Sequence, residues 1–188
     1  MRPLHLLLAL CYVLCGSLLP QLAQASTSVT VIRQPVAPLI DKVLVIKSRN
    51  QLQLLSGNTV MKSYRVSLGK NPRGPKLREG DQRTPEGFYW IDWRKTSDKF
   101  NLAMHISYPN REDLVRAHKA GVPPGSMIML HGTPIDEEYP EWYFNSLNWT
   151  NGCIAMTNHD MREVWGLVKD GTLIEIRPRA TGRQAAAA

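Results

Sequence analysis

Short runs of alternating apolar and polar residues fill most of the chain and limit its fold more than any other feature. They are rich in β-branched and aromatic residues and are separated by glycine, proline and asparagine, as strands joined by turns are. The runs occupy residues 42–48, 51–57, 61–69, 88–94, 102–109, 127–132 and 172–178. Helical spacing occurs only in residues 112–121 and after Asn158, a candidate N-cap. The sequence therefore predicts a mainly β domain, sandwich-like or barrel-like, with two short helices.

The first 25 residues have the composition of a secretory signal peptide. Arg2 supplies a positive start, residues 6–19 form an apolar core, and residues 23–25, AQA, are small enough for signal peptidase. The alternative is a retained membrane anchor, but this core is shorter than the ~20 residues that a transmembrane helix needs. We therefore expect export to the periplasm or cell envelope, with no transmembrane segment after cleavage.

The rest of the chain divides into three expected parts. Residues 26–40 carry two prolines and little charge and are expected to be a lead-in segment, residues 41–178 a single folded domain, and residues 179–188 a disordered tail. The formal net charge of the whole chain is +7. In an exported protein this basic charge suits a polyanionic wall or membrane face better than nucleic acid, although a solvated surface would explain it equally well.

Cys153 is the one cysteine left after the predicted cleavage, because Cys11 and Cys15 lie in the signal. No intramolecular disulfide is then possible, and an unpaired thiol in an oxidising compartment is prone to oxidation. Cys153 follows Gly152 in a polar loop, and His131 lies 22 residues upstream at the end of an apolar run. These residues are the parts of a cysteine nucleophile with its base, and a buried, inert thiol is the alternative.

Attack by cysteine on a carbonyl also needs hydrogen-bond donors for the oxyanion. Gly152 permits a tight turn, which could direct the backbone amides of Gly152 and Cys153 toward a substrate oxygen. A metal reading of His105, His131 and Cys153 is disfavoured because the chain has no close-spaced HxH, HExxH or CxxC pair. We expect no metal and no cofactor.

At these residues the chain resembles the L,D-transpeptidase catalytic domain family, also called the YkuD domain. The family signature is a His-Gly step, a spacer, and then Ser or Thr, any residue, Gly and Cys, which this chain has in residues 131–132 and 150–153. Residues 83–88, RTPEGF, are similar to the family's TPxGxF turn, and residues 170–172, DGT, precede the last strand. The resemblance covers roughly residues 41–178 and implies a mostly β catalytic domain.

The resemblance implies that Cys153 attacks the carbonyl of the third residue of a peptidoglycan stem peptide. D-Alanine leaves and a thioester forms on the sulfur. Attack by the side-chain amine of a neighbouring stem then gives a 3–3 cross-link, whereas water gives the reaction of an L,D-carboxypeptidase or hydrolase. His131 acts as base and acid, oriented by the carbonyl of Gly132, and the partners are donor and acceptor stem peptides.

Two positions depart from the family pattern. Many members have histidine where this chain has Asn151 and arginine where it has Ala155, which affects donor recognition and reaction outcome. Arg83, Lys76 or Arg78 could replace that arginine as a partner for a carboxylate.

His105 could line the cleft or be a wall residue, and the aromatic residues of the spacer could line a groove or form a lid. The substrate contacts we expect come from Thr150, Asn151, Arg83, His105 and Trp149. A wall-binding module without turnover is the remaining alternative function.

Overall fold

The computed structural model describes residues 39–136 and 138–181. The predicted signal peptide and nearly all of the lead-in segment therefore lie outside the described residues. By its contacts the chain divides into residues 1–36 and residues 37–188, and all the described residues belong to the second unit. Within these residues no helix has both the length and the apolar character needed to cross a bilayer.

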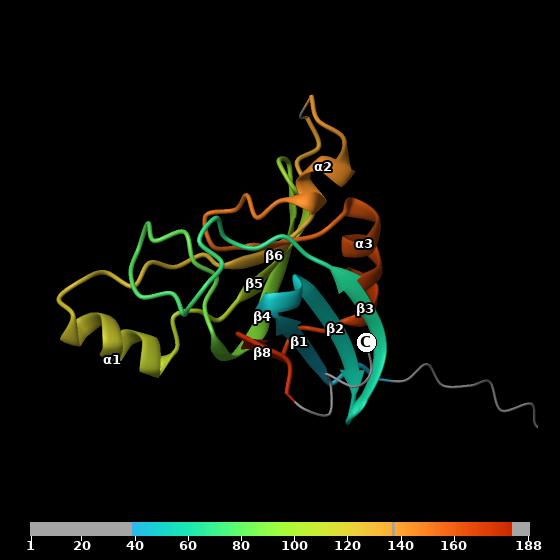
Figure 1. Ribbon diagram of the computed structural model, residues 1–188. Helices are drawn as coiled ribbons and strands as arrows, with labels where there is room; N and C mark the ends of the chain where they lie inside the picture. The colour runs from blue at the N-terminus through green and yellow to red at the C-terminus, as the bar shows by residue number, and fades with distance from the viewer. Residues whose placement is uncertain (1–38, 137, 182–188) are drawn as a thin grey trace, which may run out of the picture. The chain divides into compact units, whose positions relative to one another are not determined.

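Eight strands form one curled sheet with the order β3-β2-β1-β8-β4-β5-β6-β7 (Figure 1). The strands are β1 (Lys42–Ile46), β2 (Gln51–Ser56), β3 (Thr59–Arg65), β4 (Gly87–Ser97), β5 (Asn101–Ile106), β6 (Met129–His131), β7 (Ile154–Ala155) and β8 (Thr172–Arg177). Each predicted strand is present, and the mainly β fold is confirmed. The two ends of the sheet also meet, because the residue Ser67 after β3 bridges Ala155 of β7 through two backbone hydrogen bonds of 2.7 and 2.9 Å. This closure gives the sheet its barrel-like curl.

Among the described residues, three α-helices accompany the sheet, one more than predicted. They are α1 (Arg111–Lys119), α2 (Glu141–Ser146) and α3 (Asn158–Leu167), and a 3-10 turn, η1 (Lys47–Arg49), follows β1. The helix α2 lies in the spacer that the sequence showed only as a polar, aromatic loop. It has six residues and no side-chain cap, so neither periodicity nor capping marks it. In α3 the N-cap is Thr157, whose hydroxyl accepts the Asp160 N–H, and Asn158 is the first helical residue.

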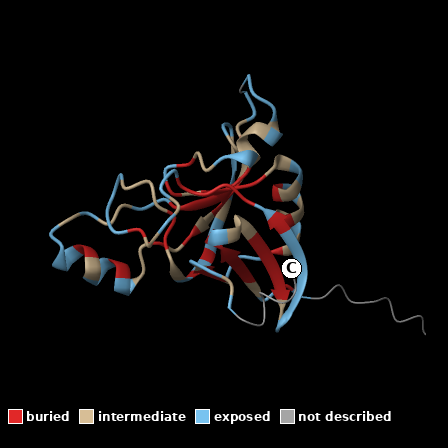
Figure 2. Cartoon of the chain, viewed as in Figure 1, coloured by how far each residue is buried: buried red, intermediate tan, exposed pale blue. Residues whose placement is uncertain are grey.

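The core lies between the inner face of the sheet and α3 (Figure 2). The stripe predicted for α3 is buried, with Met161, Val164 and Val168 at its centre. The helix α1 differs, because its Leu114 and Val115 are 50% and 47% exposed while Asp113 is buried. The carboxylate of Asp113 accepts hydrogen bonds from the Tyr89 hydroxyl at 2.9 Å and from the backbone of the N-cap Asn110. A capping box and a buried polar contact, not an apolar stripe, hold this helix.

A smaller apolar cluster covers the other face of β1. Leu44, Ile46 and Leu55 form it, and Ala180 packs against them. The predicted tail of residues 179–188 thus begins with residues that the structure describes, and residues 182–188 lie outside the described residues.

The segment of residues 70–86, between β3 and β4, is irregular as predicted, and hydrogen bonds from a buried lysine hold it in place. The ammonium of Lys47 donates to the carbonyl oxygens of Gly74 (2.6 Å) and Thr84 (2.8 Å) and to the carboxylate of Glu86 (2.8 Å). Burial lowers the pKa of Lys47, and the Glu86 carboxylate opposes that effect. The segment is thereby held at a defined place beside the ends of β3 and β4.

Candidate active site

The parallel pairing of β6 and β7 brings the chain segments that carry His131 and Cys153 side by side. His131 is the strand partner of Ala155, and Cys153 lies two residues before Ala155. Cys153 immediately precedes β7, and because Ile154 pairs with Leu130, the thiol residue lies beside β6, two residues from the position opposite His131. All three residues of β6 are buried, so the histidine stands on a fixed backbone. His131 therefore ends β6, and Cys153 lies just before the start of the neighbouring strand β7.

The His131 ring is buried and oriented by its own backbone. Only 3% of the residue is exposed, and Nδ1 lies 2.6 Å from the carbonyl oxygen of Gly132. A carbonyl can only accept a hydrogen bond, so Nδ1 carries the proton and Nε2 is the basic nitrogen. The Gly132 carbonyl thus occupies the place that the resemblance implied.

Two aromatic rings enclose the imidazole. Phe100 lies with its ring centroid 4.3 Å away, and Trp149 meets the imidazole edge-on at 5.8 Å. Burial lowers the pKa of His131 to about 4, and the hydrogen bond to Gly132 acts in the opposite direction. At neutral pH the ring is therefore an uncharged base. Trp149 belongs to the wall around this base. Phe100 is a contact that the sequence analysis missed, because it lies in the hairpin turn between β4 and β5, which carries no motif.

Cys153 is half-buried, and its Sγ lies 3.7 Å from the carbonyl oxygen of Met127. Burial raises the pKa of the thiol, while a hydrogen bond from the Met129 N–H and the positive charge of Lys76 act in the opposite direction. Burial thus favours the uncharged form of both groups, a thiol and an imidazole, over a thiolate–imidazolium pair. A base must then take the thiol proton as the sulfur attacks.

Thr150 holds the turn that presents Cys153. Its buried hydroxyl donates to the carbonyl oxygen of Cys153 at 2.7 Å and accepts the Gly152 N–H at 3.1 Å. This bond corrects the expected oxyanion pair, because the Gly152 amide is used within the turn and the Cys153 amide is left as the candidate donor. Thr150, expected to contact substrate, instead braces the nucleophile, whereas Asn151 beside it is exposed.

Gly152 is required by its surroundings. Its φ is +131°, and a Cβ built on it would lie 2.8 Å from the carbonyl oxygen of Arg83. The backbone of Arg83, in the TPxGxF region, therefore packs directly against the turn that carries the nucleophile. The Arg83 guanidinium extends from that contact, with Nη1 3.5 Å from the Pro75 carbonyl oxygen.

His105 has partners of its own. It pairs with Met129 in the β5–β6 ladder, its Nδ1 lies 2.7 Å from the Asp92 carboxylate, and its ring stacks on Trp93 at 4.7 Å. Met129 separates it from Cys153 within the sheet, so the structure favours the wall interpretation. In the described part of the chain, no group of three or more His, Cys, Asp or Glu side chains is placed to hold a metal ion.

A hydrogen-bond network that the sequence analysis missed holds the chain after His131. Glu141, the first residue of α2, accepts from the Thr133 hydroxyl at 3.1 Å and from the Asn158 N–H at 3.0 Å. The Asn158 amide in turn donates to the Thr133 hydroxyl at 3.0 Å. These contacts join the end of β6 to α2 and α3, and no sequence pattern links residues so far apart.

The profile of the YkuD family, described as an L,D-transpeptidase catalytic domain, matches residues 41–176. YafK of Escherichia coli strain K12, whose name assigns it provisionally to the L,D-transpeptidases, is 28% identical over 193 residues, which cover 95% of this chain and 68% of YafK.

Two solved structures have a similar fold. The helical cell shape determining protein Pgp2 from Campylobacter jejuni has a TM-score of 0.59 and 22% identity over 76% of this chain and 49% of its own. Bd1075 from Bdellovibrio bacteriovorus has a TM-score of 0.55 and 23% identity over 76% of this chain and 50% of its own. The present chain spans about half the length of these two proteins, and the likeness concerns the fold.

Proposed function

Because this chain belongs to the YkuD family of L,D-transpeptidase catalytic domains, we propose that it is an exported acyltransferase that acts on peptidoglycan stem peptides through Cys153. The observation that supports this most is the β6–β7 pairing, which brings the segment that carries a half-buried thiol beside the strand that ends in an uncharged imidazole. The orientation of His131 adds to it, since the Gly132 carbonyl fixes Nδ1 as the protonated nitrogen.

In the first step, Sγ of Cys153 bonds to the carbonyl carbon of the third stem residue while Nε2 of His131 accepts the thiol proton. The carbonyl oxygen becomes an oxyanion, for which the Cys153 N–H is the candidate donor. When the intermediate collapses, the carbon–nitrogen bond breaks, the leaving D-alanine takes the proton from Nε2, and a thioester remains on Cys153. His131 ends this step neutral, ready for the second one.

In the second step, His131 takes a proton from the acceptor as the acceptor attacks the thioester. A side-chain amine of a neighbouring stem bonds to the thioester carbon and the carbon–sulfur bond breaks. Sγ then takes the proton from Nε2, which restores the thiol and leaves a 3–3 cross-link. Ala155, where many family members have arginine, is buried opposite His131 and offers no cation at this position. We propose cross-linking as the reaction, and hydrolysis by water is the competing outcome that a product analysis distinguishes.

The test uses purified mature protein, the Cys153→Ala variant and isolated sacculi. New 3–3 dimers with the wild type and none with the variant would support cross-linking. Tripeptide stems, or release of a wall-linked protein, would support the same active site but show that the reaction is hydrolysis and not cross-linking. Sacculus binding that is equal in both proteins, with unchanged wall products, would overturn the enzymatic proposal and favour a wall-binding module.

A further inference from the structure

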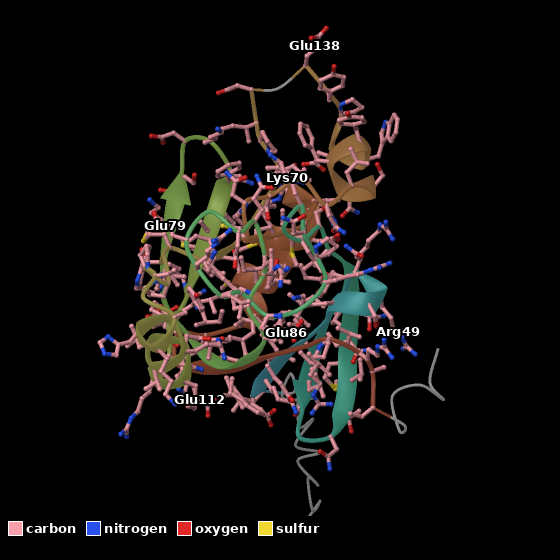
Figure 3. All side chains as sticks on the ribbon, turned by 60° about the vertical axis from the view of Figure 1, so that its left-hand side comes forward. Arg49, Lys70, Glu79, Glu86, Glu112 and Glu138 are labelled. Carbon is pink, nitrogen blue, oxygen red and sulfur yellow. The ribbon has the colours of Figure 1, made fainter. Side chains whose placement is uncertain are left out.

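A groove with three arginines lies between residues 70–86 and α1. It has a volume of about 620 Å³, and its lining includes Arg78, Arg83, Arg116, Asp81, Asn71 and Val122. The segment runs beside α1 in Figure 1, and Figure 3 labels Glu79 on the segment and Glu112 on α1 on the same side of the domain. The two walls are joined by a backbone hydrogen bond of 2.8 Å from Glu79 N to the Pro123 oxygen.

The groove carries positive charge that the protein does not neutralise. Its one carboxylate, Asp81, is paired with the buried Lys76 at 2.8 Å and accepts three backbone N–H groups, from Leu77, Arg78 and Arg83. Arg116 forms an ion pair with Asp113. Among the residues that the structure describes, no carboxylate forms an ion pair with the guanidinium of Arg78 or Arg83. Two uncompensated cations therefore face the groove.

The groove is connected to the proposed nucleophile on both walls. The carbonyl of Arg83 lies against Gly152, next to Cys153. The chain leaving Val122 reaches Met127, whose carbonyl oxygen is 3.7 Å from Sγ. An extended tetrapeptide spans roughly 14 Å. Because the Arg83 backbone contacts the turn that carries Cys153, a peptide of that length held at Cys153 can extend into the groove beside Arg83.

We propose that this arginine groove, through Arg78 and Arg83, binds the carboxylates of the donor stem peptide. The inference rests on the proposed function and deepens it, because stem peptides are acidic and the site itself lacks a cation at Ala155. Guanidinium groups bind carboxylates through paired hydrogen bonds with fixed geometry. The groove thereby orients the donor so that its scissile carbonyl meets Cys153.

The test measures binding without turnover, by calorimetry on the Cys153→Ala protein. The probes are a stem tetrapeptide with all carboxylates free, the same peptide amidated at its C-terminus, and the peptide amidated at its second residue. We expect the free acid to bind about tenfold more tightly than at least one amide, as loss of one charge-assisted hydrogen bond predicts. The amide that binds weakly identifies the carboxylate that the groove holds.

Variants then assign the effect to the groove. In the Cys153→Ala background, Arg78→Gln and Arg83→Gln should each lower the affinity for the free-acid peptide about five- to tenfold and reduce the difference in affinity between this peptide and the amide. Arg162→Gln, on the exposed surface of α3, is the matched control and should bind like its parent. Arg78 is exposed, so its variant keeps the test valid even if Arg83→Gln proves less stable.

Two outcomes separate this inference from the proposed function. Equal affinity for all three peptides, or groove variants that bind like Arg162→Gln, would overturn the proposal that the groove binds donor carboxylates, even if the wild type alters sacculi. A free-acid preference that depends on Arg78 and Arg83, in a protein that leaves sacculi unchanged, would support the groove and reject the enzymatic function.

Discussion

Removing the imidazole of His131 should make the protein less sensitive to acid. Burial lowers the pKa of this residue from 6.5 to about 4 in the folded state. As the pH falls below 6.5, the unfolded chain binds a proton that the folded chain does not, so the free energy of unfolding decreases. This loss is zero above pH 7, about 2 kcal/mol at pH 5, and about 3 kcal/mol near pH 4, below which it levels off.

The assay is urea unfolding of the wild type and His131→Gln at pH 7.5 and pH 5.0. The variant should be less stable at both values, because it loses the contacts to Gly132 and Phe100, and that loss cancels in the difference. Acidic groups elsewhere titrate in both proteins and also cancel. We expect the wild type to lose about 2 kcal/mol more than the variant between the two pH values.

The same difference tests the description of the base. An equal pH dependence in both proteins, or an imidazole that titrates near pH 6.5 by NMR in the folded protein, would mean that water reaches the ring. His131 would then be partly protonated at physiological pH, and the argument for a resting pair of thiol and neutral imidazole would be wrong.

Three further predictions concern the support of the site. Gly152→Ala should lower the free energy of unfolding by about 2–4 kcal/mol in urea melts, because the new Cβ would meet the backbone and φ is positive, whereas Gly166→Ala, with open space, should not destabilise. Lys47→Met should lower the free energy of unfolding by about 3 kcal/mol and make residues 70–86 more sensitive to protease, because Glu86 loses its buried partner. Lys62→Met removes an exposed ion pair and should lower it by less than about 1 kcal/mol. Alkylation followed by intact-mass spectrometry should give a single adduct on the mature chain, at Cys153. The alkylation rate should still increase above pH 9, because burial raises the pKa of the thiol, and a rate that levels off near pH 7 would contradict this.

Local patterns in the sequence determined most of the fold and the two central residues of the candidate site. Alternation in residues 42–48 and 88–94 is a property of neighbours along the chain, so it identified the strands without any knowledge of their partners. The lone Cys153 after Gly152, and His131 at the end of an apolar strand, were recognisable for the same reason. Ordered motifs then indicated the family that the matched residues 41–176 confirm.

Tertiary structure alone decided how these parts meet. No local pattern puts β8 between β1 and β4 or forms α2 through the contacts of Glu141. Only the folded chain could pair His105 with Asp92, use the Gly152 amide inside its own turn, and shield His131 from water. The physical reason is that hydrogen-bond partners and desolvation depend on residues distant in the chain. The reactive groups can be identified from the sequence, whereas their protonation states and their contacts depend on tertiary packing.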